Sequence, residues 1–279
     1  MPYIASIGTY LPCWGAPLHR VAGDDEDAIT LAVEAGRAAL IASGAVERVV
    51  LVTRDMPLME SSNAAVLLAG LGLDPELEVD ERLGGAPATL DALSYDCAPQ
   101  SDGAAALVLA ADEVVDRFTD RPVWIRGVGL GLDSVMHQHK PDMTTLPATT
   151  RAAKQAFSMA SMTPADVDVT EIHDFFTGIE IISYEDLGFA ERFGGYKLVE
   201  AEVTSVGGAL PVNPSGGLKA KGHPPGATGV AQCVELFAQL RGEAVNQVDG
   251  ARVALAQDIG GPTAVSAVTI LEGPANGAG

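Results

Sequence analysis

Short apolar runs alternate along the chain with longer segments in which apolar residues recur at helical spacing. Residues 49–52 and 253–256 are continuous apolar runs, which are typical of strands buried on both faces of a sheet. The segment that follows the acidic cluster 24–27 has helical periodicity, and acidic residues in a first turn complement the helix dipole. This alternation of strands and helices predicts an α/β layered fold.

The same pattern sets the expected bounds of each element. We predict strands at residues 4–8, 49–52, 123–132, 167–172, 253–256 and 265–271. We predict helices at residues 25–43, 62–71, 150–160, 179–187 and 230–240. The proline- and glycine-containing segments 10–18 and 213–229 are expected to be loops.

Segment 213–229 concentrates glycine, proline and one histidine immediately before an expected helix. Five of its 17 residues are Gly and three are Pro, and His223 stands among them. Gly lets the backbone approach a ligand closely, Pro stiffens that approach, and a helix N-terminus presents unpaired N–H groups to an anion or a developing oxyanion. We interpret His223 as a functional residue; the alternative is an ordinary loop with a surface histidine.

A second histidine, His173, directly follows the expected strand 167–172 and precedes the expected helix 179–187. Open α/β sheets bind their ligands at the carboxyl ends of strands, which favours a functional site here. The alternative is a core histidine satisfied by the backbone. Gly127-x-Gly129-x-Gly131 is only a weak match to a nucleotide-binding fingerprint, because no helix is expected directly after it.

Composition narrows the classes of partner. The net charge of −20 and the pI near 4.4 argue against nucleic acid and anionic membranes, and an anion such as CoA would need local basic groups. The three cysteines, Cys13, Cys97 and Cys233, form neither a disulfide framework nor a metal-binding pattern, which is typical of a reducing cytoplasm. We expect no signal peptide, no membrane span and no bound metal.

Three stretches resemble known motifs. Asn213-Pro-x-Gly-Gly followed by Lys-Gly-His223-Pro-x-Gly-Ala-Thr-Gly resembles the His loop of the thiolase superfamily. The nearest form is that of the sterol-carrier and lipid-transfer-protein thiolases and the archaeal acetyl-CoA acetyltransferases. Glu171-x-His173-Asp-x-Phe-Thr resembles a second motif of that branch, and the stretch 96–109 resembles the strand that closes its N-terminal half.

The resemblance implies a thiolase-like fold of two related βαβαβ halves with layered sheets and helices. These would span 1–121, the N-terminal half, and 122–279, the C-terminal half. The N-terminal half is short for the family: a strand and a loop subdomain expected before residue 96 are missing. Members of the family are usually homodimers.

The resemblance also implies roles for individual residues. In this branch the residue matching His173 polarises the thioester carbonyl, and we expect His223 to be the general acid or base. Backbone N–H groups near Gly261 would stabilise an oxyanion. Lys219 and Lys221 are the expected partners of CoA phosphates, or else two solvated lysines, and Gly226 and Asn213 complete the expected substrate site.

The family nucleophile has no counterpart in this sequence. The family places a Cys where this chain has Gly84 and Gly85, and no Cys lies between Cys13 and Cys97. Glycine cannot carry an acyl group covalently. Cys97 matches a family cysteine that is not the nucleophile.

Two functions follow from these observations. The first is a thiolase-like enzyme that acts on a 3-keto- or 3-hydroxyacyl-CoA, by acyl transfer or carbon–carbon cleavage, with CoA as part of the substrate and no other cofactor. The second is a non-catalytic acyl-CoA-binding or scaffold subunit. Relatives in this branch often pair with a small zinc-ribbon/OB-fold protein, so such a partner is expected in either case.

Overall fold

The computed structural model describes residues 3–10, 14–16, 19–21, 28–40, 48–53, 63–74, 78–83, 97–136, 139–140 and 142–274. Its strands are β1 (Tyr3–Tyr10), β2 (Trp14–Ala16), β3 (His19–Val21), β4 (Arg48–Thr53), β5 (Glu78–Leu83), β6 (Ala104–Ala110), β7 (Val123–Leu132), β8 (Val169–Ile172), β9 (Val253–Gly260) and β10 (Val265–Glu272). Its α-helices are α1 (Ala28–Ala39), α2 (Asn63–Leu71), α3 (Pro147–Ala160), α4 (Thr177–Asp186), α5 (Gly195–Glu200), α6 (Gly217–Lys221) and α7 (Thr228–Arg241), and η3 (Asp112–Arg117) and η5 (Pro164–Asp166) are short 3₁₀ helices.

The main sheet has six strands in the order β6-β1-β7-β10-β9-β8. Only β8 and β9 pair in parallel within it, and β1 meets β7 through just two residue pairs, Tyr3 with Trp124 and Ile4 with Val123. Strands of both predicted halves, 1–121 and 122–279, therefore join in one sheet across a narrow contact. The division into these two domains stays a prediction.

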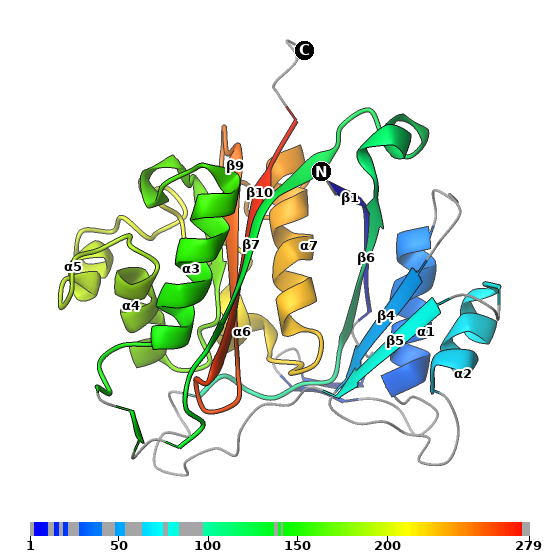
Figure 1. Cartoon of the computed structure of the whole chain (residues 1–279), viewed down its shortest axis with the longest axis horizontal. Coiled ribbons are helices and arrows are strands. Elements are labelled where there is room, and N and C mark those ends of the chain that lie inside the picture. The colour runs from blue at the N-terminus through cyan, green and yellow to red at the C-terminus, as the bar shows by residue number, and fades with distance from the viewer. Residues whose placement is uncertain are drawn as a thin grey trace.

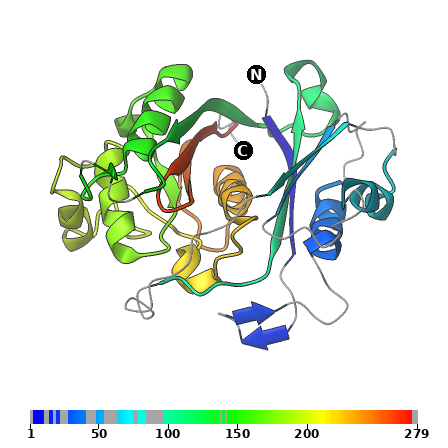
Figure 2. The same cartoon turned by 60° about the horizontal axis from the view of Figure 1, so that its bottom comes forward.

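Helices lie inside and outside this curved sheet (Figures 1 and 2). Helix α7 runs between the β7–β10 side and the β1–β6 side, while α3 packs outside β7 and β10 and α1 packs outside β1 and β6. Leu236 and Phe237 of α7 are buried in one core cluster with Val169 of β8 and Leu271 of β10. Because α7 contacts strands on both sides, it brings its N-terminal end, and the loop before it, into the middle of the molecule.

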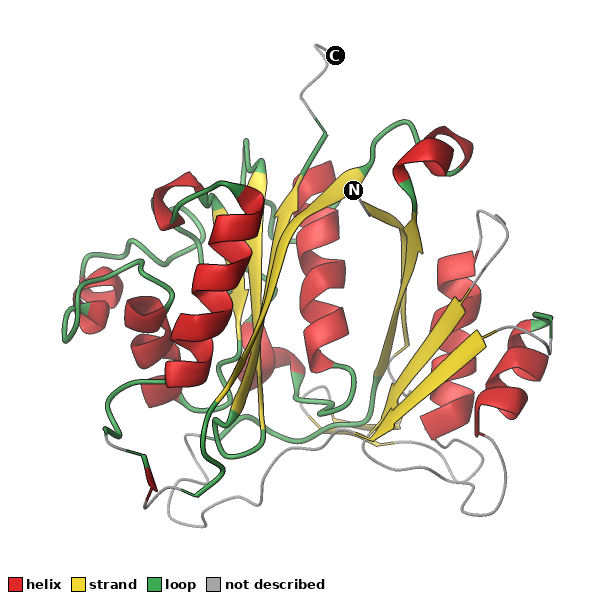
Figure 3. Ribbon diagram, in the orientation of Figure 1, coloured by secondary structure: helices red, strands yellow, loops and turns green. Residues whose placement is uncertain are grey.

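A parallel pair, β4 and β5, forms a separate two-stranded sheet, with α2 between its strands in the chain (Figure 3). Parallel neighbours need such a crossover connection, so this is a βαβ unit. The α1–α2 contact buries Ile29, Val33 and Leu67 together. The layered α/β architecture expected from the sequence is confirmed.

Most predicted elements are present with small shifts at their ends. Strand 123–132 is confirmed to the residue, and helix 150–160 begins three residues earlier, at Pro147. The helix predicted at 25–43 is described over Ala28–Ala39, and its remaining ends lie outside the described residues. Two expected loops contain regular structure instead: segment 10–18 contributes β2, and segment 213–229 contains α6.

The Gly127-x-Gly129-x-Gly131 pattern is explained by packing. A Cβ atom added at any of these glycines would lie 1.8–2.1 Å from a backbone carbonyl oxygen of α3. The intervening side chains Val128 and Leu130 are exposed on the opposite face. The glycines therefore allow α3 to lie directly on β7, and they carry no sign of a nucleotide site.

Gly129→Ala is expected to destabilise the fold, because its methyl group would overlap the Ala152 carbonyl oxygen at 1.9 Å and force α3 away from β7. Overpacking of this kind costs about 1–3 kcal/mol in the free energy of unfolding. Urea unfolding measures it. Gly178→Ala is the matched control, because nothing lies within 4 Å of a Cβ at that position. Equal stability of both variants would contradict the close α3–β7 packing.

Candidate active site

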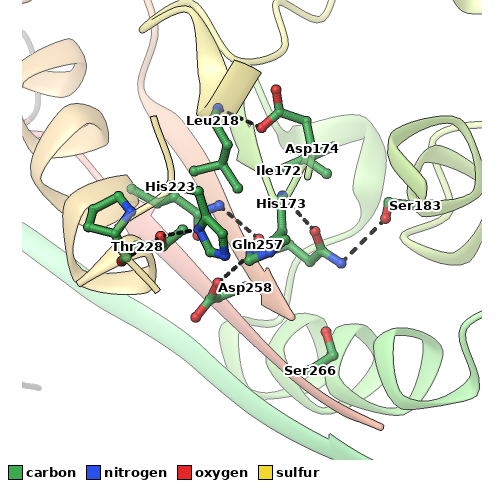
Figure 4. A network of polar contacts seen from close by, with 12 residues as sticks. Ile172, His173, Asp174, Ser183, Leu218, His223, Thr228, Gln257, Asp258 and Ser266 are labelled. Atoms are coloured by element: carbon green, nitrogen blue, oxygen red, sulfur yellow. Dashed lines mark hydrogen bonds and ion pairs between the residues drawn. The ribbon is translucent and has the colours of Figure 1, made fainter. Parts of the chain in front are cut away.

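His173 lies at the carboxyl end of β8, in the four-residue connection to α4 (Figure 4). The parallel register places Ile172 opposite Gln257 of β9, so the two residues after Ile172 and Gln257 are also neighbours. The backbone N–H of His173 donates to Gln257 Oε1 over 3.0 Å, and its ring Nδ1 lies 2.6 Å from Asp258 Oδ1. Strand pairing thus fixes both the backbone and the ring of His173.

The Gln257 side chain is completely buried and has partners on two helices. Its Nε2 donates to Thr149 Oγ1 of α3 over 3.2 Å and to Ser183 Oγ of α4 over 3.4 Å. The amide is therefore held at its nitrogen end while its oxygen accepts from His173. This network of buried hydrogen bonds therefore fixes the position of His173 relative to α3 and α4.

His223 lies in the loop between α6 and α7, five residues before Thr228. Its backbone bonds to the segment after Cys97, with its N–H donating to Pro99 O over 2.8 Å and its carbonyl accepting from Ser101 N over 3.2 Å. Its ring Nδ1 is 2.8 Å from Thr228 Oγ1, and that hydroxyl donates to Pro224 O over 2.9 Å. Since the only hydroxyl proton is used, the network assigns the proton to Nδ1 and leaves a lone pair on Nε2.

The two histidine rings meet edge to face. Their centroids are 5.0 Å apart and their planes are 84° apart, and the Phe175 ring packs against His173 at the same centroid distance. Burial, reinforced by the neighbouring His173 and partly offset by Asp258, lowers the pKa of His223 to about 4. His223 is therefore neutral at physiological pH, and in the described part of the chain neither Nε2 atom makes a hydrogen bond.

The acidic residues of the Glu171-x-His173-Asp174 motif hold the His loop. Both carboxylate oxygens of Glu171 accept from Ser215, from its backbone N–H at 3.1 Å and its hydroxyl at 2.7 Å. Asp174 Oδ1 accepts from the N–H of Leu218 at 2.7 Å, at the start of α6. Ser215 and Leu218 of the loop are thereby held by the segment that contains His173.

Glycines allow the sharp turn into α6. Gly216 and Gly217 have φ values of 99° and 63°, and a Cβ at Gly217 would lie 2.2 Å from Asp174 Oδ2. Only glycine fits that close approach and that backbone conformation. Sequence patterning missed α6 because a single helical turn has no periodicity to detect.

Asn213 supports the edge of β8. Its Oδ1 accepts from the Ile172 N–H at 2.7 Å, its backbone N–H donates to Thr170 O at 2.8 Å, and its own φ is 51°. Residues 211–213 thus continue the hydrogen bonding of the sheet edge. The side-chain oxygen of Asn213 is thus bonded to the protein backbone, and a contact of Asn213 with substrate stays a prediction.

The two predicted CoA lysines also have protein partners. Lys221 Nζ lies 3.7 Å from Glu171 Oε2 and 3.4 Å from Glu235 Oε1. Lys219 Nζ donates to the Cys97 carbonyl over 3.3 Å. A role for either ammonium group in binding CoA phosphates stays a prediction.

The remaining predicted contacts lie on different sides of the site. Gly226 lines a pocket that also contains Asp258. Gly261, with φ of 59°, lies in the β9–β10 turn, and no hydrogen bond joins it to either histidine in the described residues. The buried Lys140 holds that turn by donating to Pro262 O and Thr263 O over 3.1 and 3.2 Å.

The described cysteines are poor nucleophile candidates. Burial, with a smaller contribution from Asp258, raises the pKa of Cys233 to about 12, so its thiol is protonated at neutral pH. Cys97 is half-buried and its thiol donates to the Ala98 carbonyl. Gly84, Gly85 and Cys13 lie outside the described residues.

Comparison with known proteins identifies the family. A family model described as "Thiolase C-terminal domain-like" matches residues 129–273, which is just over half of the chain and includes both histidines and Asp258. The chain belongs to the thiolase superfamily. The expectation from the histidine motifs is thereby confirmed.

Its thiolase relatives are longer proteins. An acetyl-CoA acetyltransferase of Methanothermobacter thermautotrophicus is 45% identical over 176 residues, covering 63% of this chain and 46% of that protein. Sterol carrier protein 2 of Bos taurus is 42% identical over 170 residues, covering 59% of this chain and 31% of that protein. The chain therefore spans less than half the length of these curated relatives.

Solved structures share the thiolase fold at low sequence identity. A chain titled "Ltp2-ChsH2(DUF35) aldolase" superposes with a TM-score of 0.77 at 17% identity, covering 97% of both chains. An SCP2-thiolase-like protein of Mycobacterium smegmatis superposes with a TM-score of 0.69 at 14% identity, covering 97% of this chain and 77% of that one. At these identities the likeness concerns the fold. No helix in the described residues is long and apolar enough to cross a membrane.

Buried titratable groups in this site make a pH-dependent contribution to stability. Burial outweighs the Lys221 and Ser215 contacts and raises the pKa of Glu171 to about 7. Because this pKa is raised, Glu171 contributes to the stability of the fold when it is protonated. The contribution is fully present below the unfolded-state pKa of about 4.5 and is lost as the pH rises through about 7. The contribution of His223 to stability changes with pH in the opposite direction. Because its pKa is lowered in the folded protein, the unfolded chain binds more protons between about pH 4 and 6.5, so stability rises with pH over this range.

Glu171→Gln is expected to remove the falling contribution and leave stability rising with pH between about 4 and 6.5, by about 3 kcal/mol in total. His223→Gln is expected to remove the rise due to His223, so that the free energy of unfolding falls between about pH 4.5 and 7 because of Glu171. The measurement is the free energy of urea unfolding across this range. Glu200→Gln, at an exposed residue of α5, is the control and should leave the profile unchanged. Identical profiles for all three variants would contradict these assignments.

Proposed function

We propose that this chain cleaves or forms a carbon–carbon bond next to the thioester of an acyl-CoA, by acid–base and oxyanion chemistry, without a cysteine nucleophile of its own. One observation carries the proposal. The rings of His173 and His223 meet edge to face with their centroids 5.0 Å apart, and each Nδ1 contacts a protein group. In the described part of the site both Nε2 atoms are left for a ligand.

The names of similar proteins support a substrate class. One relative is named an acetyl-CoA acetyltransferase and one structural neighbour an aldolase. Both names describe chemistry that makes or breaks a bond beside an acyl carbonyl. A 3-hydroxy- or 3-ketoacyl-CoA is therefore the proposed substrate. Retro-aldol cleavage of the 3-hydroxy form is favoured, because it requires no enzyme thiolate.

In this reaction His223 is the base. Its Nε2 takes the proton of the substrate's 3-hydroxyl while the bond between C2 and C3 breaks. The bonding electron pair moves to form the enolate of the shortened acyl-CoA, and the 3-carbon leaves as an aldehyde or ketone. The protonated His223 then returns its proton to C2, which regenerates the neutral imidazole.

His173 is the proposed partner of the enolate oxygen. The contact between its Nδ1 and Asp258 Oδ1, at 2.6 Å, holds the imidazole ring in place and leaves Nε2 to interact with the enolate oxygen. Backbone N–H groups near Gly261 are proposed to contribute to the same oxyanion site. Their turn is held by the buried Lys140, which keeps it in one conformation.

The test is cleavage of a 3-hydroxyacyl-CoA or 3-ketoacyl-CoA by the protein and by its His173→Ala and His223→Ala variants. From the 3-hydroxyacyl-CoA we expect the wild-type protein to release a carbonyl compound and a shortened acyl-CoA in equal amounts. Both variants should lose this activity while still unfolding in one cooperative urea transition, which shows that they are folded. Turnover that survives both substitutions would show that the assignment is wrong.

The second candidate is a non-catalytic acyl-CoA-binding subunit. It is favoured by the absence of any Cys between Cys13 and Cys97 and by the protonated thiol of the half-buried Cys233. The name of the aldolase neighbour includes a DUF35 component, so a small partner protein is proposed in either case, as is a homodimer. Calorimetry at low salt discriminates: binding of CoA without turnover, alone and with such a partner, would favour the scaffold.

A further inference from the structure

A pocket of about 270 Å³ lies between α7 and the strands β6, β9 and β10. Leu107 of β6, Val230 and Cys233 of α7, Asp258 of β9, and Ala267 and Thr269 of β10 lie in its wall. These residues come from both sides of the curved sheet. The pocket therefore lies against α7, the helix that runs between the β7–β10 side and the β1–β6 side of the sheet (Figure 2).

Asp258 belongs to both the pocket and the histidine site. Its Oδ1 contacts His173 Nδ1 at 2.6 Å, and its side chain is 34% exposed whereas that of His173 is only 4% exposed. Gly229 makes room for it, because a Cβ there would lie 2.6 Å from Asp258 Oδ2. Asp258 thus connects the wall of the pocket to the proposed reaction site.

The wall chemistry selects a neutral, apolar occupant. None of the described residues that line the pocket is basic, and Asp258 and the net charge of −20 both oppose an anion. Burial keeps the Cys233 thiol protonated and uncharged. Leu107, Val230 and Ala267 offer aliphatic surface, which a hydrocarbon covers favourably.

The apolar surface continues past the pocket along the sheet. Ala267 pairs with Leu130 and Thr269 pairs with Val128 across the antiparallel β10–β7 ladder. Directly paired residues lie on the same face of a sheet. Leu130 and Val128 are 57% and 49% exposed, so a chain that leaves the pocket would meet further apolar side chains.

We propose that this pocket takes the hydrocarbon tail of a linear acyl group whose thioester lies at the histidine pair, and that the CoA part stays outside. This deepens the proposed function and rests on it for the position of the thioester. The tail would enter past Asp258 and lie between α7 and β10, and a longer tail would extend over Leu130.

The test uses neutral probes, so that CoA-binding groups play no part. N-acetylcysteamine thioesters of acetic, butyric, hexanoic and octanoic acid are titrated by calorimetry. Each added methylene should tighten binding about three- to fourfold until the pocket is filled, after which affinity stays constant. Equal affinity for all four thioesters, or no binding of any, would overturn the proposal.

Variants locate the effect. Ala267→Phe fills the pocket, so the octanoyl thioester should bind this variant no more tightly than the acetyl thioester does. Val230→Ala widens the pocket, so affinity should continue to increase with acyl-chain length beyond the point at which it becomes constant in the wild-type protein. Ala201→Phe, the same change as the first at an exposed residue after α5, should behave as wild type. Loss of chain-length dependence in Ala201→Phe, or its survival in Ala267→Phe, would contradict the pocket.

The two proposals can fail separately. His223→Ala should keep the chain-length dependence and lose turnover. If the protein shows that dependence but cleaves no acyl-CoA, the pocket stands and the catalytic proposal falls. If it cleaves acyl-CoA but binds all thioesters equally, the catalytic proposal stands and the pocket falls.

Discussion

Replacing His223 with Gln is expected to lower the kcat for cleavage of a 3-hydroxyacyl-CoA by about 10²–10⁴-fold, the usual contribution of a positioned general base. Gln preserves the approximate volume of the side chain but offers no basic nitrogen. The network through Thr228 and Pro224 leaves the lone pair of His223 on Nε2, which is the atom available to the substrate. Initial rates of acyl-CoA release measure the loss.

The pH profile gives an independent check on this role. Because burial lowers the pKa of His223 to about 4, the acidic limb of kcat/KM should fall well below the ordinary imidazole pKa of about 6.5. Thr228→Val removes the hydrogen-bond partner that fixes the tautomer and should cost about tenfold in kcat, the value of one hydrogen bond. An acidic limb near pH 6.5, or full activity in His223→Gln, would contradict the assignment.

Asp258→Ala is the second substitution with a large expected effect. Without the carboxylate the His173 ring loses the partner of its Nδ1, so its Nε2 is no longer held toward an enolate oxygen. Removing one oxyanion donor typically lowers kcat by about 10²–10³-fold, and we expect a loss in that range with little change in KM. Steady-state kinetics on the isolated variant measure both constants.

Chemical rescue separates this positioning role from a purely structural one. Asp258 borders an open pocket, so added formate should reach the vacated position and restore part of the activity of Asp258→Ala. Asp168→Ala is the control: Asp168 accepts from the N–H groups of Arg252 and Val253 at the start of the same strand, so its loss should lower stability and leave kcat unchanged. Absence of rescue together with a normal kcat in Asp258→Ala would refute the role.

The positions of the two histidines were largely predictable from the sequence. His173 follows a run of strand periodicity and His223 precedes a helical one, and these patterns depend only on neighbouring residues. The motifs around them also indicated the family, which the match over residues 129–273 confirms. Local pattern is sufficient here because each histidine lies at the end of a regular element.

The partners of those histidines required the tertiary structure. Asp258 is 85 residues from His173 in the chain and reaches it only because β8 and β9 pair in one particular register. Thr228 lies inside a motif that the sequence singled out, yet its bond to His223 depends on the loop's exact turn. Lys221, expected to face CoA, is paired with Glu171 and Glu235 because a buried carboxylate needs a nearby cation.

The sequence by itself determined the alternating α/β pattern, the two histidines, the acidic balance and the absence of a cysteine at the family's nucleophile position. Only the tertiary structure showed that the two histidine rings are in contact and that a pocket adjoins Asp258. It also showed which nitrogen of His223 carries the proton. The physical reason is that periodicity and residue type act between near neighbours, whereas hydrogen-bond partners, burial and the pKa of His223 depend on groups that meet only when the sheet closes around α7.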